Sequence, residues 1–314
     1  MTTRLGVGNQ RIKAVLKVRV KMLDAARSWL GGQGFVEVQG PILLPAAGER
    51  PHNFHVNYFG QSAYLSGGLQ PYSDVFVEMF EKVYTVAPTF RVEPSKTKRH
   101  LTEFWRVEIA ASGFNLEQML RVQEEMVAYV CHELFKDAGE ELCFLRGSTE
   151  NLNRVKVPFP RITYDEAVER LQRTKCRIHW GEPLNWENEQ RLSLMFDRPF
   201  FVTDFPVSGE TYFHKSNPVK PELSLCADLL APEGYGEISS AGETITDKKE
   251  LLKKLKETQI EPADRRWYLS LKRFSYAPKS GFALGVERFL QWICKLENVS
   301  EAASFPRTYE RIYP

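Results

Sequence analysis

The chain has 314 residues, of which 43% are hydrophobic and 26% are charged, and this composition is typical of a globular protein with one large domain or about two ordinary ones. Its 42 lysines and arginines nearly balance 40 aspartates and glutamates, which leaves a formal net charge of +2 and excludes a uniformly basic coat for nucleic acid. No segment approaches the roughly 18 uninterrupted apolar residues of a membrane span. The N-terminus also lacks an apolar core followed by a small-residue cleavage site, so we expect a cytoplasmic protein.

The cysteines and histidines predict neither disulfides nor a tightly held transition metal. Five cysteines are scattered without a CxxC pair, at positions 131, 143, 176, 226 and 294, and we expect them to be reduced thiols. The six histidines are equally scattered and form no HExxH motif or cluster with cysteine.

The N-terminal third predicts one helix followed by short strands. Apolar residues recur at helical spacing over 15–30, and the glycines that follow end this helix before a strand-like run that stops at Pro41. Further short strands are expected at 55–59, 63–67 and 83–88. The runs 89–93 and 103–112 flank a polar, basic segment and predict an open hairpin.

The remainder predicts more strands, interrupted by helices. A long amphipathic helix is expected over 116–135, whereas 137–200 gives no clear pattern. We expect strands at 199–206, 211–216, 223–231 and 235–242, charged helices at 246–257 and 264–274, and a glycine-rich strand leading into a helix over 280–297. This succession favours an α+β fold with an antiparallel sheet, in a single domain over 15–314 after an N-terminal arm, 1–14.

Charged residues gather around the hairpin predicted near residue 90. Arg91 and Glu93 lie at the end of one strand, where alternation places both on the same face. The loop that follows carries Lys96, Lys98, Arg99 and His100. Such a loop can hold a polyphosphate while an aromatic ring stacks on a base, although a solvated turn is the alternative interpretation.

Two later segments carry candidate ligands for phosphate or metal. Asp228 and Glu237 flank the turn APEGYG, which can bring both carboxylates to one Mg²⁺ that bridges phosphates, although acids beside turns are common. In the segment GFALGVER, Gly281 and Gly285 allow close approach of a ligand and Arg288 stands at the start of a helix. Tight packing alone would also explain the glycines.

In their joint order, these segments resemble motifs 2 and 3 of the class II aminoacyl-tRNA synthetases. FRVE and RHLTEFWRVE carry the resemblance to motif 2, and GFALGVER carries that to motif 3. The helix and strand that end at Pro41 resemble motif 1, the dimer interface of the class, which implies a homodimer through residues 15–45. The likeness covers nearly all of 15–308 and is greatest to the asparaginyl-tRNA synthetases and the asparagine synthetase-related enzymes derived from them. It implies an antiparallel sheet flanked by helices, with ATP and Mg²⁺ as cofactors.

The resemblance also implies a role for individual residues. Arg91 would bind the α-phosphate, Arg99 and His100 the terminal phosphates, and Phe104 and Arg288 the two faces of the adenine. Glu93 belongs to the same ATP-binding set, Asp228 and Glu237 would hold Mg²⁺, and Arg91, Arg288 and Glu237 would be the catalytic groups. Glu49, Gln70 and Glu108 match family positions that bind the α-ammonium group of the amino acid, which requires acceptors and counter-charge.

The sequence departs from the family pattern in the pocket for the amino-acid side chain. Ser73 stands where the aspartate enzymes have a lysine, which suits an asparagine-type pocket, and Lys279 stands where relatives usually have histidine. Thr244 stands where both relatives place an arginine that holds the side chain. Either Lys215 or His214 substitutes for it, or the substrate differs, unless the alignment slips near APEGYGE.

A second departure concerns the length of chain before motif 1. Only about fourteen residues precede it, too few for the anticodon-binding barrel of these synthetases, so we expect a catalytic core on its own. From this we expect an ATP-dependent ligase that adenylates aspartate or a related amino acid and transfers it to ammonia or a small amine, without tRNA. Two alternatives are a truncated asparaginyl-tRNA synthetase-like enzyme that acylates tRNA, and a non-catalytic paralogue that binds an amino acid or nucleotide.

Overall fold

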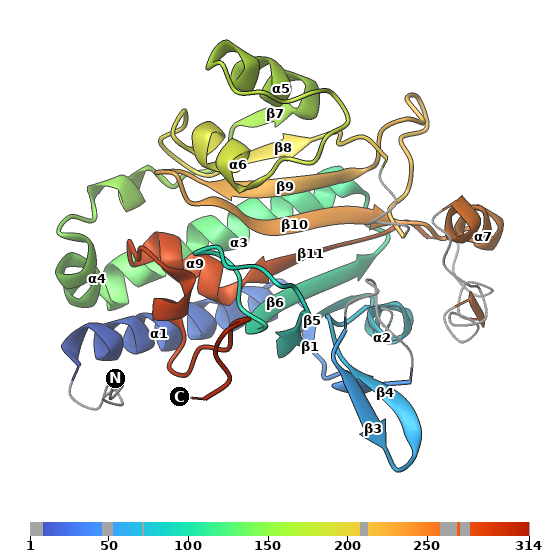
Figure 1. Ribbon diagram of the computed structural model, residues 1–314, viewed down its shortest axis with the longest axis horizontal. Coiled ribbons are helices and arrows are strands. Elements are labelled where there is room, and N and C mark those ends of the chain that lie inside the picture. Colours follow the sequence, from blue (N-terminus) through green and yellow to red (C-terminus); the bar gives the residue numbers. More distant parts are fainter. Residues whose placement is uncertain are drawn as a thin grey trace.

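The computed structural model describes residues 9–45, 53–70, 72–207, 213–257, 269–270 and 277–313 (Figure 1). Its centre is a sheet of eight strands in the order β1-β5-β6-β11-β10-β9-β8-β7. Only the outermost pairs, β1 with β5 and β7 with β8, are parallel, and every other neighbouring pair is antiparallel. The expected α+β fold with an antiparallel sheet flanked by helices is therefore confirmed.

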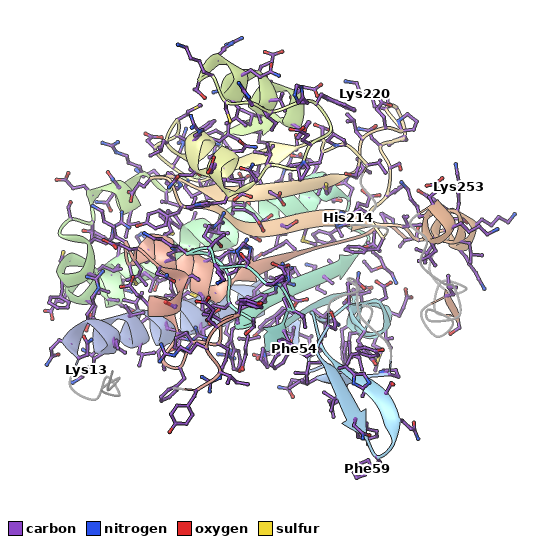
Figure 2. All side chains as sticks on the ribbon, viewed as in Figure 1. Lys13, Phe54, Phe59, His214, Lys220 and Lys253 are labelled. Atoms are coloured by element: carbon purple, nitrogen blue, oxygen red, sulfur yellow. The ribbon has the colours of Figure 1, made fainter. Side chains whose placement is uncertain are left out.

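The strands of the large sheet are β1 (Val36–Glu37), β5 (Lys82–Phe90), β6 (Glu103–Ser112), β7 (Arg161–Thr163), β8 (Phe200–Thr203), β9 (Cys226–Ala231), β10 (Gly236–Thr244) and β11 (Lys279–Gly285). A second sheet of three strands consists of β2 (Leu43–Leu44), β3 (His55–Tyr58) and β4 (Gln61–Leu65). Its β3–β4 hairpin projects from the body of the molecule, with Phe59 at the tip (Figure 2).

The helices are α1 (Gln10–Gly32), α2 (Ser73–Phe80), α3 (Leu116–Asp137), α4 (Gly139–Arg146), α5 (Tyr164–Arg173), α6 (Trp186–Ser193), α7 (Lys248–Glu257) and α9 (Val286–Ile293). The first of them begins before the helix expected over 15–30, because the side chain of Asn9 accepts hydrogen bonds from the backbone N–H groups of Arg11 and Ile12. None of the described helices is both long and apolar enough to cross a membrane.

The sheet presents two chemically different faces because side chains alternate along its strands. Val107 and Ile109 of β6, Leu229 of β9 and Leu284 of β11 belong to the main hydrophobic core. Helices α1 and α3 contribute to this core and lie against each other on that side of the sheet (Figure 1). The opposite face is free of these helices.

The middle of the chain, whose sequence gives no clear pattern, extends the sheet. Strands β7 and β8 continue it beyond β9, and α5 and α6 cover them with a second core that includes Ile162, Leu171, Leu192 and Phe200. A capping box between Thr163 and Glu166 starts α5. Phe201 of β8 also reaches the main core. The two strands have only three and four residues, too few for a clear alternating pattern in the sequence.

Two predictions for the second half of the chain differ from the structure. No strand forms over the described part of 211–216. Phe213 and Lys215 instead form backbone hydrogen bonds with the end of β10, and Lys215 also with Leu225. The helix expected over 264–274 falls largely outside the described residues.

Candidate active site

A cavity of about 540 Å³ opens on the face of the sheet opposite α1 and α3. It is lined by twelve of the candidate site residues, which come from five elements and the loops between them. These residues are Gln70, Ser73, Arg91, Glu93, Arg99, His100, Phe104, Glu108, Asp228, Glu237, Thr244 and Arg288. Glu49 lies outside the described residues.

Small residues make the floor of this cavity. Gly281 of β11 pairs with Ala110 of β6 on one side and Gly242 of β10 on the other, so three adjacent strands present almost no side chain there. A Cβ on Gly281 would lie 2.5 Å from the carbonyl oxygen of Ile109, closer than backbone atoms tolerate. The glycine therefore permits both the strand pairing and the space above it.

An aromatic ring with two guanidinium groups close to it marks one part of the cavity. Arg91 follows β5 directly, and its N–H donates to the carbonyl oxygen of Thr102 across the hairpin. The guanidinium carbon of Arg91 lies 5.6 Å from the centre of the Phe104 ring, and that of Arg106 lies 5.2 Å from it. This arrangement combines an aromatic surface with positive charge, as an adenine and its phosphates require.

The loop between β5 and β6 holds His100 beside Glu93. The Nε2 atom of His100 lies 3.6 Å from a Glu93 carboxylate oxygen, and its Nδ1 lies 2.9 Å from the Ser95 hydroxyl oxygen. Burial, and then the charge of Arg288, lower the pKa of His100. The imidazole is therefore a neutral hydrogen-bonding group at neutral pH.

Arg99 is the buried member of this loop, and its partner, Glu189, is not among the site residues predicted from the sequence. Its side chain forms an ion pair with Glu189 of α6 and donates to the carbonyl oxygen of Glu237. The ring of Trp186, at the start of α6, lies 4.6 Å from the guanidinium carbon. The same Glu189 carboxylate accepts a hydrogen bond of 3.0 Å from the backbone N–H of Glu237. Helix α6 thus joins the basic loop to β10.

A β-bulge brings Glu237 to the face that carries Asp228. Glu237 pairs with Leu230 and Ser239 with Leu229, so Ile238 is an extra residue in β10. Regular alternation would have pointed Glu237 away from the cavity. Arg288, at the start of α9, donates a hydrogen bond of 2.7 Å to the Glu237 carboxylate.

The surroundings shift the pKa values of the two carboxylates in opposite directions. Burial, and then the nearby charge of Glu237, raise the pKa of Asp228 well above its usual range. Burial also acts to raise the pKa of Glu237, but the charges of Arg288 and Arg99 outweigh it and hold that pKa at about 2. A divalent cation would relieve the repulsion between the two acids, and two oxygen ligands completed by phosphates suit Mg²⁺. The described residues contain no cluster of three or more histidine, cysteine or acidic side chains that could bind a metal unaided.

The far end of the cavity offers acceptors for a cation. The Oε1 atom of Gln70 is buried without a hydrogen-bond partner among the described residues. Glu108 lies nearby on β6, where its carboxylate accepts a hydrogen bond of 2.8 Å from the backbone N–H of Leu69. A small ammonium group would satisfy both side chains.

The structure separates the two residues considered as substitutes for the missing arginine. Thr244 and His214 both line the cavity. Lys215 does not, because it forms an ion pair of 2.8 Å with Glu243, which precedes Thr244 and so points to the opposite face of β10. Lys279 lies opposite Thr244 on β11 and forms an ion pair of 2.7 Å with Glu78.

Comparisons with known proteins agree with this architecture. Residues 3–309 match the family model for tRNA synthetases class II (D, K and N). The asparagine–tRNA ligase of Pyrococcus abyssi is 40% identical over 311 residues, which are 99% of this chain and 72% of the relative.

Solved structures show the same likeness. The asparaginyl-tRNA synthetase of Pyrococcus horikoshii, complexed with asparaginyl-adenylate, superimposes with a TM-score of 0.95 at 40% identity, over 97% of this chain and 70% of that one. The Entamoeba histolytica enzyme, also in complex with asparaginyl-adenylate, gives a TM-score of 0.88 at 25% identity, over 96% and 69%.

Proposed function

This chain belongs to the class II tRNA synthetase family for aspartate, lysine and asparagine, and from that premise we propose that it activates asparagine with ATP and transfers the asparaginyl group to tRNA. The family consists of AMP-forming ligases. The substrate is proposed from relatives that are asparagine–tRNA ligases and from two structures that hold asparaginyl-adenylate.

The expectation of a tRNA-independent ligase that uses ammonia or a small amine was wrong. It depended on the short segment before residue 15, and the length of that segment says nothing about the acceptor that the cavity serves. Relatives that match 99% of this chain at 40% identity transfer their amino acid to tRNA. The net charge of +2 excludes only a uniformly basic surface, and it does not bear on the acceptor because a local surface contacts phosphates.

One observation carries the proposal: a single cavity holds the groups suited to a nucleotide and the acceptors suited to an ammonium group. Arg91 and Phe104 stand at one part of it, and Gln70 and Glu108 at another. Each half alone would fit many ligands. Together they fit ATP and an amino acid whose carboxylate points at the α-phosphate.

The reaction follows from charge and position. A carboxylate oxygen of the amino acid attacks the α-phosphorus, the bond to the β-phosphate oxygen breaks, and pyrophosphate leaves. Arg91 neutralises charge that develops on the α-phosphate, and Arg288 does so beside Glu237. When bound, Mg²⁺ would be held by Asp228 and Glu237 and would supply charge neutralisation for the phosphates. No protein nucleophile is needed, because the carboxylate of the amino acid is itself the nucleophile.

A hydroxyl group of tRNA then attacks the carbonyl carbon of the mixed anhydride, and AMP leaves. Pyrophosphate exchange tests the first step, and retention of radioactive asparagine on tRNA tests the second. We expect asparagine to support exchange and to be transferred to tRNA. Absence of asparagine-dependent exchange in the presence of Mg²⁺ and ATP would refute the proposal.

We further propose that residues 15–314 act as one catalytic domain and that residues 15–45 form the interface of a homodimer. Apolar side chains support this interface, since Val20, Val36, Ile42 and Leu43 are 57%, 39%, 44% and 42% exposed. A second copy of the chain would remove them from water.

A further inference from the structure

The end of the cavity beyond Gln70 is where the side chain of a bound amino acid would lie, given the proposed function. Its walls come from α2, the end of β10, the start of β11 and the segment around His214. Figure 2 shows His214 beside the end of β10 that lies toward α7 (labelled in Figure 1). This segment is fixed in place by backbone hydrogen bonds of 2.9 Å from Lys215 to Glu243 and 2.8 Å from Ile245 to Phe213.

The imidazole of His214 lies directly over the floor of the cavity. Its Nε2 atom is 2.3 Å from the position that a Cβ on Gly242 would occupy, so the ring takes the space that any side chain at 242 would need. The ring of Phe213 packs edge-on against it, with ring centres 4.5 Å apart. Gly242 therefore leaves the space that the imidazole occupies, and Phe213 packs against the imidazole from the side.

The other ring nitrogen determines what Nε2 can do. The Nδ1 atom of His214 is buried and has no hydrogen-bond partner within the described part of the chain. A buried N–H without an acceptor is costly, so the proton of a neutral ring is better placed on Nε2. Burial lowers the pKa of His214 to about 4, which keeps the ring neutral at physiological pH. Nε2 is then an uncharged donor that faces the cavity.

Among the residues that the structure describes, the lysines near this end of the cavity are already paired. Lys279 binds Glu78, and Lys215 binds Glu243 on the opposite face of β10. Ser73 and Thr244 add only neutral hydroxyl groups to the lining. A negatively charged side chain placed here would lose its hydration without gaining a free counter-charge from the described walls. An uncharged group with a carbonyl oxygen would lose much less.

We propose that His214 is a specificity-determining residue, which donates a hydrogen bond from Nε2 to the side-chain oxygen of the amino-acid substrate and thereby selects a carboxamide over a carboxylate. The inference rests on the proposed function and assigns the recognition of asparagine to a neutral imidazole. The proposed role of His214 also explains the glycine at position 242, because a larger residue there would displace the imidazole.

Amino-acid-dependent pyrophosphate exchange tests this, measured separately with asparagine and with aspartate. The variant His214→Phe keeps an aromatic ring above Gly242 and removes both nitrogens. We expect it to lower kcat/KM for asparagine about tenfold or more, to reduce the preference for asparagine over aspartate, and to leave KM for ATP unchanged. Gly242→Ala should have a similar effect, because its methyl group would occupy the place of Nε2.

The matched control is Lys215→Gln, on the adjacent residue that points away from the cavity. It should alter thermal stability without altering the preference between the two amino acids. An unchanged preference in His214→Phe, with asparagine still used by the wild-type chain, would overturn the role of His214 and leave the proposed function standing. A wild-type chain that does not use asparagine would overturn the proposed function, and this inference with it.

Discussion

Arg91 stands where β5 enters the basic loop, within reach of both the aromatic ring of Phe104 and the carboxylate of Glu93. Its guanidinium carries the charge that we place at the α-phosphate. The Arg91–Glu93 separation is 3.7 Å, which is long for a charge-assisted hydrogen bond.

Replacing Arg91 tests this role directly. Arg91→Ala should reduce the rate of pyrophosphate exchange by a factor of about 10² to 10³, because charge that develops in the transition state loses its partner. The side chain is partly exposed at the cavity, so the fold should survive. Exchange reduced to this extent, with an unchanged circular dichroism spectrum, is the expected result, and full exchange by the variant would contradict the assignment.

At the scale of elements, helix α6 connects parts of the site that are distant in the sequence. Its Glu189 contacts Arg99 of the motif 2 loop and the backbone N–H of Glu237 in β10. Both side chains of the ion pair are largely buried, with exposed fractions of 4% and 12%. Loss of one partner would leave an uncompensated charge inside the protein.

Glu189→Ala should therefore lower the free energy of unfolding by about 3 to 5 kcal/mol and should also weaken pyrophosphate exchange, since the loop and β10 lose their common anchor. Glu189→Gln, which keeps an acceptor for the Glu237 N–H, should cost less. Urea denaturation measures the stability. Glu187→Ala, an exposed position on the same helix, serves as the control and should leave both quantities unchanged.

The same elements show what a sequence can and cannot predict. Strand β6 was expected over 103–112 and spans Glu103–Ser112, because its alternating pattern is local. The motifs that contain Arg91, Phe104 and Arg288 are local as well. The contact between Arg99 and Glu189 joins residues 90 positions apart, so no local pattern reports it. The bulge at Ile238 likewise depends on how β9 and β10 pair.

At the scale of the whole molecule, the proposed dimer gives a further prediction. Val20 is exposed on α1, within the segment proposed as the interface. Val20→Glu should convert a dimer to a monomer, as measured by sedimentation velocity, because a charge would be buried between the two copies. Val219→Glu, at an equally apolar position that is 84% exposed and far along the chain, is the control. A dimer that persists in Val20→Glu would place the interface elsewhere.

The central claim is that the activated asparagine is transferred to tRNA and not to ammonia. The direct measurement mixes preformed enzyme-bound asparaginyl-adenylate with tRNA in one reaction and with ammonium in another, and follows radioactive asparagine in a single turnover. Transfer to tRNA with release of AMP, and no faster decay with ammonium than with buffer, is the predicted result. Retention of the label by the enzyme in the presence of tRNA, with rapid consumption by ammonium, would contradict it.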